Sequence, residues 1–424
     1  MVIILGGCGS SPIDPLDAEF LGDLPPLNPD LPAEEITLEV WLDLDFVRPS
    51  PLFLEMAQEF EAAYPQVTVN IQPFVPETIP AKLNRAIQTG NSPDVVQGHV
   101  YAMAARGMAQ PIDGFWQAWG VEDQFIPAAL EEVTWRGQKY GVPLDIYTLV
   151  LLFNKSHFDE AGLPYPDAGY TWLQLVEDAA TLTSGDGARY GLGFTADPWH
   201  VSAWLSEAGG YLVRGDALSG FTLTLDDPNN IAALDFLRML SYKQGYGPLP
   251  TTRPRDYEDP RKFFLDDQIS MYFGGPWDIH YIQVADPDFP LGVTQLPQTP
   301  AGVEAASALG STGLFVPTGA RHREVALEFI KWATSDRYGL PMARRLGRYP
   351  ARTWLQTTPY FAGNARLKPF LNQLDAARPY HLDAFPEIER HFADAVKKTF
   401  YGANAEDALK EAQQLSLPLM EETP

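Results

Sequence analysis

The sequence contains a single cysteine in 424 residues, Cys8. No disulfide can therefore form within the chain, and no cluster of cysteines can bind a metal ion. Basic residues are also few, because 30 Lys and Arg face 55 Asp and Glu and the net charge is −25. Contacts with phosphate need a basic surface, so this charge argues against nucleic-acid binding. We expect no nucleic-acid partner and a fold that rests on its hydrophobic cores.

Other signals are missing as well. Beyond the first residues, no uninterrupted apolar stretch is long enough to cross a membrane. The seven histidines are scattered without the spacing of metal ligands on a helix, so we expect no metal and no cofactor. The sequence has no P-loop, no nucleophile elbow and no dinucleotide fingerprint. What remains is a globular composition, 45% hydrophobic and 12% aromatic, in a chain long enough for two or three domains.

The first 33 residues predict an anchor and a spacer. Leu5-Gly6-Gly7-Cys8 resembles a bacterial lipoprotein cleavage site, whose cysteine becomes lipidated. The basic segment that usually precedes such a site is missing, which leaves open a truncated start or an ordinary apolar N-terminus with a buried cysteine. Residues 9 to 33 are rich in Pro, Asp and Gly without a sustained period, as in a flexible tether. We therefore expect an exported protein held at the membrane by lipidation of Cys8.

From residue 34 onward, strand patterns alternate with helix patterns. Residues 36 to 40 alternate as in a strand, and Asp43 and Asp45 stand just past its end. Residues 51 to 64 present one apolar helical face, which begins with Ser50 as a capping residue and Pro51 in the first position. The same alternation continues along the chain. It predicts an α/β fold with a parallel or mixed sheet covered by helices on both faces.

The stretch from 139 to 163 changes character twice. Gly141 and Pro143 indicate a short irregular link, and residues 149 to 153 are an apolar run typical of a strand buried on both faces. A short helix follows, with Ser156 placed to cap it and Gly162 placed to end it. A strand buried on both faces implies a sheet that is covered on both sides.

Several segments follow one another in a characteristic order between residues 35 and 415. They are "YGVPLDIYTLVLLFNKSHFDEAGL" before "TWLQL", "FFLDDQISMYFGGPWDI", "FPLGVTQLP" before "GSTGLFVP" and "REVALEFIKWATS", and "FADAVKKTFYGANAEDALKEAQ". None of them is specific alone, but by their order and spacing they together resemble the extracellular solute-binding proteins of sugar ABC transporters, the maltose-binding-protein-like group.

The resemblance implies a two-lobe fold of the periplasmic-binding-protein type, class II, in which both α/β lobes are discontinuous and hinge segments join them. It implies a first lobe of residues 34–144 plus 297–346, a second lobe of residues 147–290 plus 350–420, and crossings at 141–148, at 291–297 and around Arg348. The ligand is then expected between the lobes, which close around it.

A sugar presents hydroxyls at its edges and an apolar C–H face, so its site needs aromatic rings and hydrogen-bonding groups. Trp277 follows a Gly-Gly-Pro turn at the end of an expected strand. Asp197 and Trp199 fall where the family has an acidic residue and an aromatic that contact sugar. The alternatives are that Trp277 packs the following helix and that Trp199 belongs to the core.

The remaining candidates are weaker. Each has an ordinary structural alternative, such as a turn, a solvated surface or, for Arg348, a salt bridge across the hinge. They are Asp43 and Asp45 after the first strand, Tyr147 in the first crossing, His99 and Tyr101 after "PDVVQG", Thr312 and Gly313 as backbone donors, and Arg348 at the last crossing.

The leading functional hypothesis is a monomeric, lipid-anchored receptor, without catalytic activity, that captures a carbohydrate and delivers it to an ABC permease. Within binding proteins, a polyamine could use the aspartates as counter-charges, and a glycerophosphate-like anion could use Arg348. A secreted glycoside hydrolase is the alternative from another class, because it also needs acidic and aromatic residues in a cleft, with two carboxylates at a set separation.

Overall fold

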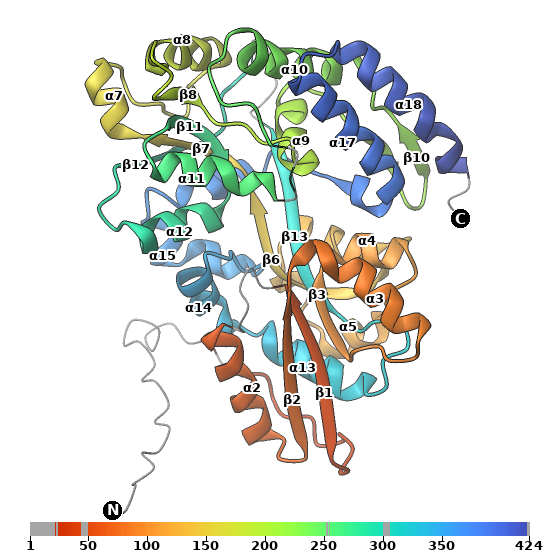
Figure 1. Cartoon of the computed structure of the whole chain (residues 1–424). Helices are drawn as coiled ribbons and strands as arrows, with labels where there is room; N and C mark the ends of the chain where they lie inside the picture. Colours follow the sequence, from red (N-terminus) through yellow and green to blue (C-terminus); the bar gives the residue numbers. More distant parts are fainter. Residues whose placement is uncertain are drawn as a thin grey trace, which may run out of the picture.

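The computed structural model describes residues 22, 24–43, 50–251, 253, 255–299 and 306–421. Figure 1 shows two lobes, one above the other, with two long strands running between them. The N-terminal third of the chain builds most of the lower lobe, here called the first lobe. The upper lobe, here called the second lobe, contains the middle of the chain and its C-terminal helices.

The first lobe is built on a mixed six-stranded sheet. Its strands follow the order β14-β13-β3-β1-β2, and β6 pairs with β13 as well. β1 is parallel to β2 and β3, whereas β13 is antiparallel to β3 and β6. The strands are β1 (Ile36–Asp43), β2 (Val67–Phe74), β3 (Val95–Gly98), β6 (Gly141–Thr148), β13 (Ser307–Phe315) and β14 (Ala377–Pro379).

Short helices surround this sheet, and a small hairpin lies beside them. They are α2 (Pro51–Ala63), η1 (Pro76–Thr78), α3 (Ile79–Gln88), α4 (Val100–Ala105), α5 (Asp113–Trp119), α6 (Pro127–Glu131) and α13 (Arg323–Ala333), and the hairpin is β4 (Thr134–Trp135) with β5 (Gln138–Lys139). α14 (Asp336–Leu346) lies at the junction, where it packs on α2 of the first lobe and on α12 (Pro276–Ala285) of the second.

The second lobe has a four-stranded sheet of order β12-β7-β11-β8, also mixed. Every residue of β7 is buried, which confirms the expected strand with both faces covered. Its strands are β7 (Val150–Asn154), β8 (Tyr190–Leu192), β11 (Ile269–Gly274) and β12 (Leu291–Thr294).

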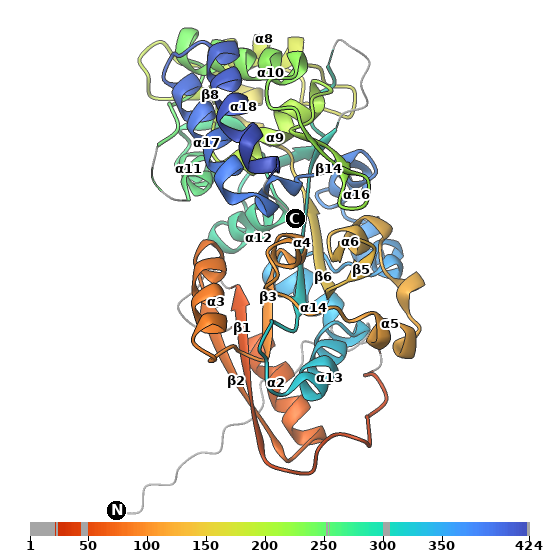
Figure 2. The same ribbon diagram turned by 90° about the vertical axis from the view of Figure 1, so that its right-hand side faces the viewer.

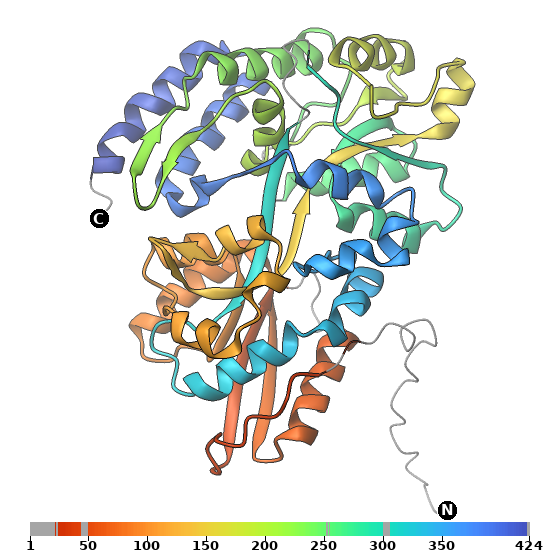
Figure 3. The same cartoon turned by 180° about the vertical axis from the view of Figure 1, so that it is seen from behind.

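Helices cover the second sheet, and α17 and α18 lie side by side on its outer part (Figure 2). A separate hairpin, β9 (Val213–Asp216) with β10 (Gly220–Leu223), reaches toward the first lobe (Figure 3). The helices are α7 (Lys155–Ala161), α8 (Trp172–Leu182), α9 (Pro198–Glu207), α10 (Pro228–Arg238), η4 (Asp256–Glu258), α11 (Asp259–Leu265), α12, α15 (Pro359–Ala362), α16 (Lys368–Leu374), η6 (His381–Ala384), α17 (Pro386–Phe400) and α18 (Ala405–Glu421).

The junction between the lobes is more regular than the sequence indicated. The expected irregular link at Gly141 and Pro143 is wrong, because these residues belong to β6, which pairs with β13 along its whole length. Pro143 has no N–H to donate, and the pairing shifts by one residue beside it. On its other edge, β6 bonds to the last crossing, where the Ile146 N–H donates to the Tyr349 carbonyl at 2.8 Å. Three segments of the chain therefore run together through the junction.

Two further local predictions are wrong. The first strand does not end before Asp43, which is its last residue and pairs with Phe74. The helix after β7 is capped by Asn154, whose side chain accepts from the N–H of Ser156, so Ser156 is inside the helix. By contrast, Gly162 ends that helix in the left-handed conformation, as expected.

The return crossing expected at 291–297 is also displaced. Residues 291–294 form β12, which pairs antiparallel with β7 inside the second sheet. The strand that runs between the lobes is β13, further along the chain (Figure 1).

Candidate functional site

Three aromatic side chains from three different elements meet between the lobes. The Tyr147 ring of β6 lies 5.5 Å from Trp199 of α9 and 5.3 Å from Trp277 of α12, both edge-on, and the two tryptophans are 6.0 Å apart. All three side chains are partly exposed. We call them the aromatic cluster.

Local structure fixes both tryptophans. Trp277 occupies the first turn of α12, and its ring folds back over Gly275, where a Cβ would stand 2.3 Å from a ring atom. Glycine is therefore required at 275 for the ring to lie there. Trp199 is in the first turn of α9, and its indole N–H donates to the Leu309 carbonyl of β13 at 3.2 Å. That bond ties α9 to the strand that runs between the lobes.

Asp197 lies next to the cluster as the N-cap of α9. Its carboxylate accepts from the N–H of His200 at 3.0 Å and contacts the His200 ring at 2.7 Å. Burial raises the pKa of Asp197, but the hydrogen bonds and charge of His200 outweigh burial and hold the pKa below its usual value. The His200 ring in turn packs edge-on against Trp199 at 5.0 Å. No local sequence pattern singles out His200 as a site residue.

His99 joins the two lobes at the edge of the cluster. It follows β3 of the first lobe, and one ring nitrogen lies 3.0 Å from a carboxylate oxygen of Asp383, in η6 of the second lobe. The other nitrogen lies 3.2 Å from the Tyr147 hydroxyl. Burial lowers the pKa of His99, but the hydrogen bond and charge of Asp383 outweigh it and raise the pKa to about 9. The side chain is 46% exposed, so solvent reaches it.

A second set of contacts lies behind His99. The His381 ring stacks on Tyr101 at 3.8 Å and lies 3.2 Å from the Glu132 carboxylate. Burial lowers the pKa of His381, but Glu132 outweighs it and raises the pKa. Tyr101 is itself buried, so it supports this interlobe contact and lies behind the aromatic cluster.

Arg348 holds the junction together. Its guanidinium donates to the carboxylates of Asp43 and Asp145, both at 2.9 Å. Asp145 also accepts from the Thr312 N–H at 2.8 Å and from its hydroxyl at 2.7 Å. Thr312 and Gly313 are buried within β13 and are not part of the aromatic cluster. The salt-bridge role considered for Arg348 is what the structure shows.

Two predicted residues, Asp45 and Cys8, lie outside the described residues. Within the described part of the chain, no group of three or more His, Cys, Asp or Glu could hold a metal ion. In the same residues, no helix is both long and apolar enough to cross a membrane.

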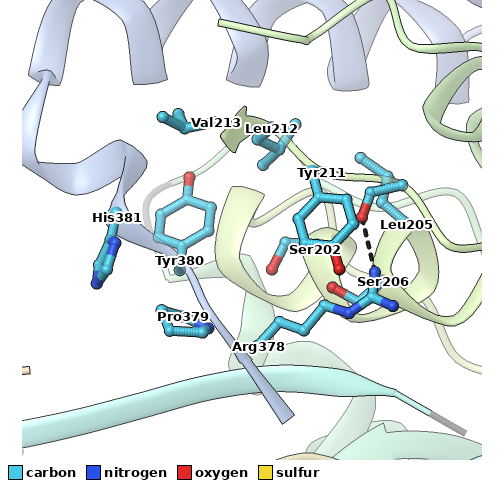
Figure 4. Close-up of a pocket in the computed structure, with 11 residues that line it drawn as sticks. Ser202, Leu205, Ser206, Tyr211, Leu212, Val213, Arg378, Pro379, Tyr380 and His381 are labelled. Atoms are coloured by element: carbon cyan, nitrogen blue, oxygen red, sulfur yellow. Dashed lines mark hydrogen bonds between the residues drawn. The ribbon is translucent and has the colours of Figure 1, made fainter. Parts of the chain in front are cut away.

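Two hollows lie elsewhere. One cavity of about 40 Å³ lies between α9 and β14 and is lined by Ser206, Tyr211, Arg378 and Tyr380, with Arg378 donating to the Gly210 carbonyl at 3.1 Å (Figure 4). It has room for a few water molecules only. The other, of about 360 Å³, is a groove on the first lobe, lined by Glu39, Trp41, Gln72, Asn91 and Asp94 among others. We call it the outer groove.

Comparison with known proteins identifies the family. A family model described as bacterial extracellular solute-binding protein matches residues 55–369, most of the chain. The chain belongs to this family. Membership confirms the resemblance seen in the sequence and places this solute-binding protein outside the cytoplasm.

The similar proteins agree with this assignment. A binding protein of Brucella abortus is 24% identical over 372 residues, which cover 85% of this chain and 88% of the relative. The diacetylchitobiose-binding protein DasA of Streptomyces coelicolor is 25% identical over 340 residues, 78% and 76% of the two chains. Among solved structures, an ABC transporter solute-binding protein of Thermotoga lettingae bound with α-D-tagatose has a TM-score of 0.80 at 25% identity, covering 91% and 99%. The expected two-lobe fold is confirmed.

Proposed function

We propose that this solute-binding protein captures a sugar between its lobes and presents it to the permease of an ABC importer. The observation that carries the proposal is the aromatic cluster, in which Tyr147, Trp199 and Trp277 come together from separate parts of the chain. Aromatic faces pair with the apolar C–H face of a sugar ring. The sugars bound by the relatives support the same ligand class.

Hydrogen-bonding groups surround the cluster. Asp197 and His99 lie beside it with side chains that are 28% and 46% exposed, so they can exchange water for sugar hydroxyls. The cluster contains residues of both lobes, since β6 runs through the junction while α9 and α12 belong to the second lobe. A ligand that touches both lobes favours the closed arrangement over the open one.

The paired charges support a neutral ligand over the two charged alternatives. A polyamine would need free carboxylates, but Asp43 is paired with Arg348, Asp197 with His200, and Asp383 with His99. A glycerophosphate-like anion would need Arg348, which two carboxylates already hold. A charged ligand would have to separate one of these pairs, which costs free energy. A neutral sugar binds without separating them.

We also propose that the protein works as a monomer anchored to the membrane through Cys8. The Leu5-Gly6-Gly7-Cys8 sequence and the Pro-rich segment behind it support this placement. A tether of that composition would let the lobes reach a permease in the same membrane.

Isothermal titration calorimetry against a panel of mono- and oligosaccharides tests the proposal. We expect at least one sugar to bind, Trp199→Ala to weaken it strongly, and Trp41→Ala in the outer groove to leave it unchanged. If Trp41→Ala weakened sugar binding and Trp199→Ala did not, the ligand would lie in the outer groove. Spermidine and glycerophosphocholine serve as the charged competitors, and their binding in place of every sugar would refute the proposal. Product analysis after long incubation tests the hydrolase alternative, because turnover would exclude a pure receptor.

A further inference from the structure

Two contacts between the lobes stand on opposite sides of the aromatic cluster. On one side, His99 of the first lobe pairs with Asp383 of the second at 3.0 Å. On the other, the Tyr257 hydroxyl in η4 of the second lobe donates to the Glu77 carboxylate in η1 of the first at 2.9 Å. We call these contacts the histidine bridge and the tyrosine bridge.

The rings between the bridges form a continuous row. The Tyr257 ring stacks on His200 at 5.5 Å, His200 meets Trp199 at 5.0 Å, and Trp199 meets Tyr147 at 5.5 Å. The Tyr147 hydroxyl then reaches His99, the first member of the histidine bridge. Only three ring-to-ring steps separate one side of the site from the other. His200 is buried, whereas Tyr147, Trp199 and Tyr257 are partly exposed, so the row leaves few ring faces on which a sugar unit could stack.

Further contacts between the lobes lie behind the histidine bridge. Behind it, His381 pairs with Glu132. Further out, Trp135 of the first lobe stacks on Phe221 of the β9–β10 hairpin at 5.8 Å. At the hairpin tip, Leu218 lies against Gly137, where a Cβ would be 3.8 Å from it. A long chain leaving the site on this side would have to break ionic, stacking and apolar contacts together.

The contact on the other side involves a surface residue. Glu77 is exposed, and the Tyr257 hydroxyl donates to its carboxylate between η4 and η1. The two sides of the site are therefore unequal, with a strong barrier behind His99 and a weaker one at Tyr257.

We propose that these bridges restrict the site to sugars of one or two rings, and that a third ring can be admitted only on the tyrosine-bridge side. This inference rests on the proposed function and adds the size of the ligand to it. Longer chains lose affinity because each added ring finds no stacking partner and displaces a bridge.

The test is a length series of one to four rings in the gluco, manno, galacto and N-acetylglucosamine families, titrated by calorimetry. Within the sugar family that binds, we expect the ligand with the lowest Kd to have one or two rings. The four-ring member should have a Kd at least about tenfold higher. Glu77→Ala should reduce the difference in Kd between the two-ring and three-ring members. Asp383→Asn should not reduce it, because the contacts behind the histidine bridge remain. Glu35→Ala, an exposed glutamate of the same lobe, is the matched control.

The outcomes separate the two proposals. Three- or four-ring sugars that bind as tightly as shorter ones to the wild-type protein would overturn the size limit and leave sugar capture standing. A length preference unchanged in Glu77→Ala would overturn the role of the tyrosine bridge. If no sugar of any length bound, the proposed function and the size limit would both be refuted. Glu77 lies on the surface, so its replacement leaves the cores intact, and a melting curve of each variant checks this.

Discussion

Replacing Trp277 by alanine should abolish most sugar binding while leaving the ligand-free protein folded. Truncating an aromatic anchor of a binding site usually costs about 2 to 4 kcal/mol. Since about 1.4 kcal/mol is a factor of ten, Kd should rise roughly thirtyfold to a thousandfold. The cost to the empty protein should be smaller than the roughly 3 to 5 kcal/mol of a buried tryptophan, because Trp277 is partly exposed and its ring lies over Gly275.

Two measurements on the same protein sample separate these effects. Calorimetric titration gives Kd, and chemical unfolding without ligand gives the free energy of unfolding. Trp332→Ala is the matched control, because Trp332 is 2% exposed in the core of the first lobe and packs edge-on against Phe60 at 5.7 Å. We expect that control to lose about 3 to 5 kcal/mol of stability and to keep sugar affinity wherever it remains folded.

One pattern of results would refute the reasoning. If Trp277→Ala bound sugar normally and unfolded as easily as Trp332→Ala, then Trp277 would be a core residue and the aromatic cluster would not hold the ligand face. The same titration on Trp199→Ala would then show whether that ring carries the binding alone.

Three further predictions concern pH, the junction and the anchor. The histidine bridge raises the pKa of His99 from 6.5 to about 9, so the bridge should stabilise the closed form fully below pH 6.5, less as pH rises, and not at all above pH 9. Sugar titrations across this pH range should therefore show affinity that weakens as pH rises. Arg348→Met should leave two buried carboxylates without their cation and lower the free energy of unfolding by roughly 3 to 5 kcal/mol, measured in urea. Cys8→Ser in the native host should release the protein from the membrane fraction, and its persistence there would contradict lipid anchoring.

Periodicity predicted most of the fold because buried strands and capped helices leave local signals. The alternation at 36 to 40 and the apolar run at 149 to 153 correspond to β1 and β7. Thr171 and Gln174, a Thr-x-x-Gln pair in the sequence, form a capping box at the start of α8. The prediction of an irregular link at β6 is wrong because Gly141 and Pro143 usually mark irregular chain, whereas here the pairing of β6 with β13 shifts by one residue next to Pro143.

The candidate site was predictable only in part. Trp277 follows β11 through a Gly-Gly-Pro turn, and Asp197 caps the helix that holds Trp199 in its first turn. Turn and capping residues of this kind can be recognised in a sequence. Tyr257 and Asp383 have no such sequence signal, since each acquires its role from a partner far away in the chain, Glu77 and His99 respectively. Long-range pairing of this kind depends on how the lobes meet, which no local pattern encodes.

The position of β13 has a consequence for how the chain is made. β13 supplies the neighbour that β3 lacks, and the Gln97 side chain donates to the Thr312 hydroxyl across 215 positions of sequence. The first sheet therefore stays incomplete, with an open edge, until most of the chain has left the ribosome, although its first strands are synthesised early. Contacts this distant in sequence make folding slow. This protein works outside the cytoplasm and must cross a membrane first. Late completion of the first lobe keeps the nascent chain unfolded during that transit. Both lobes then fold together outside the cytoplasm.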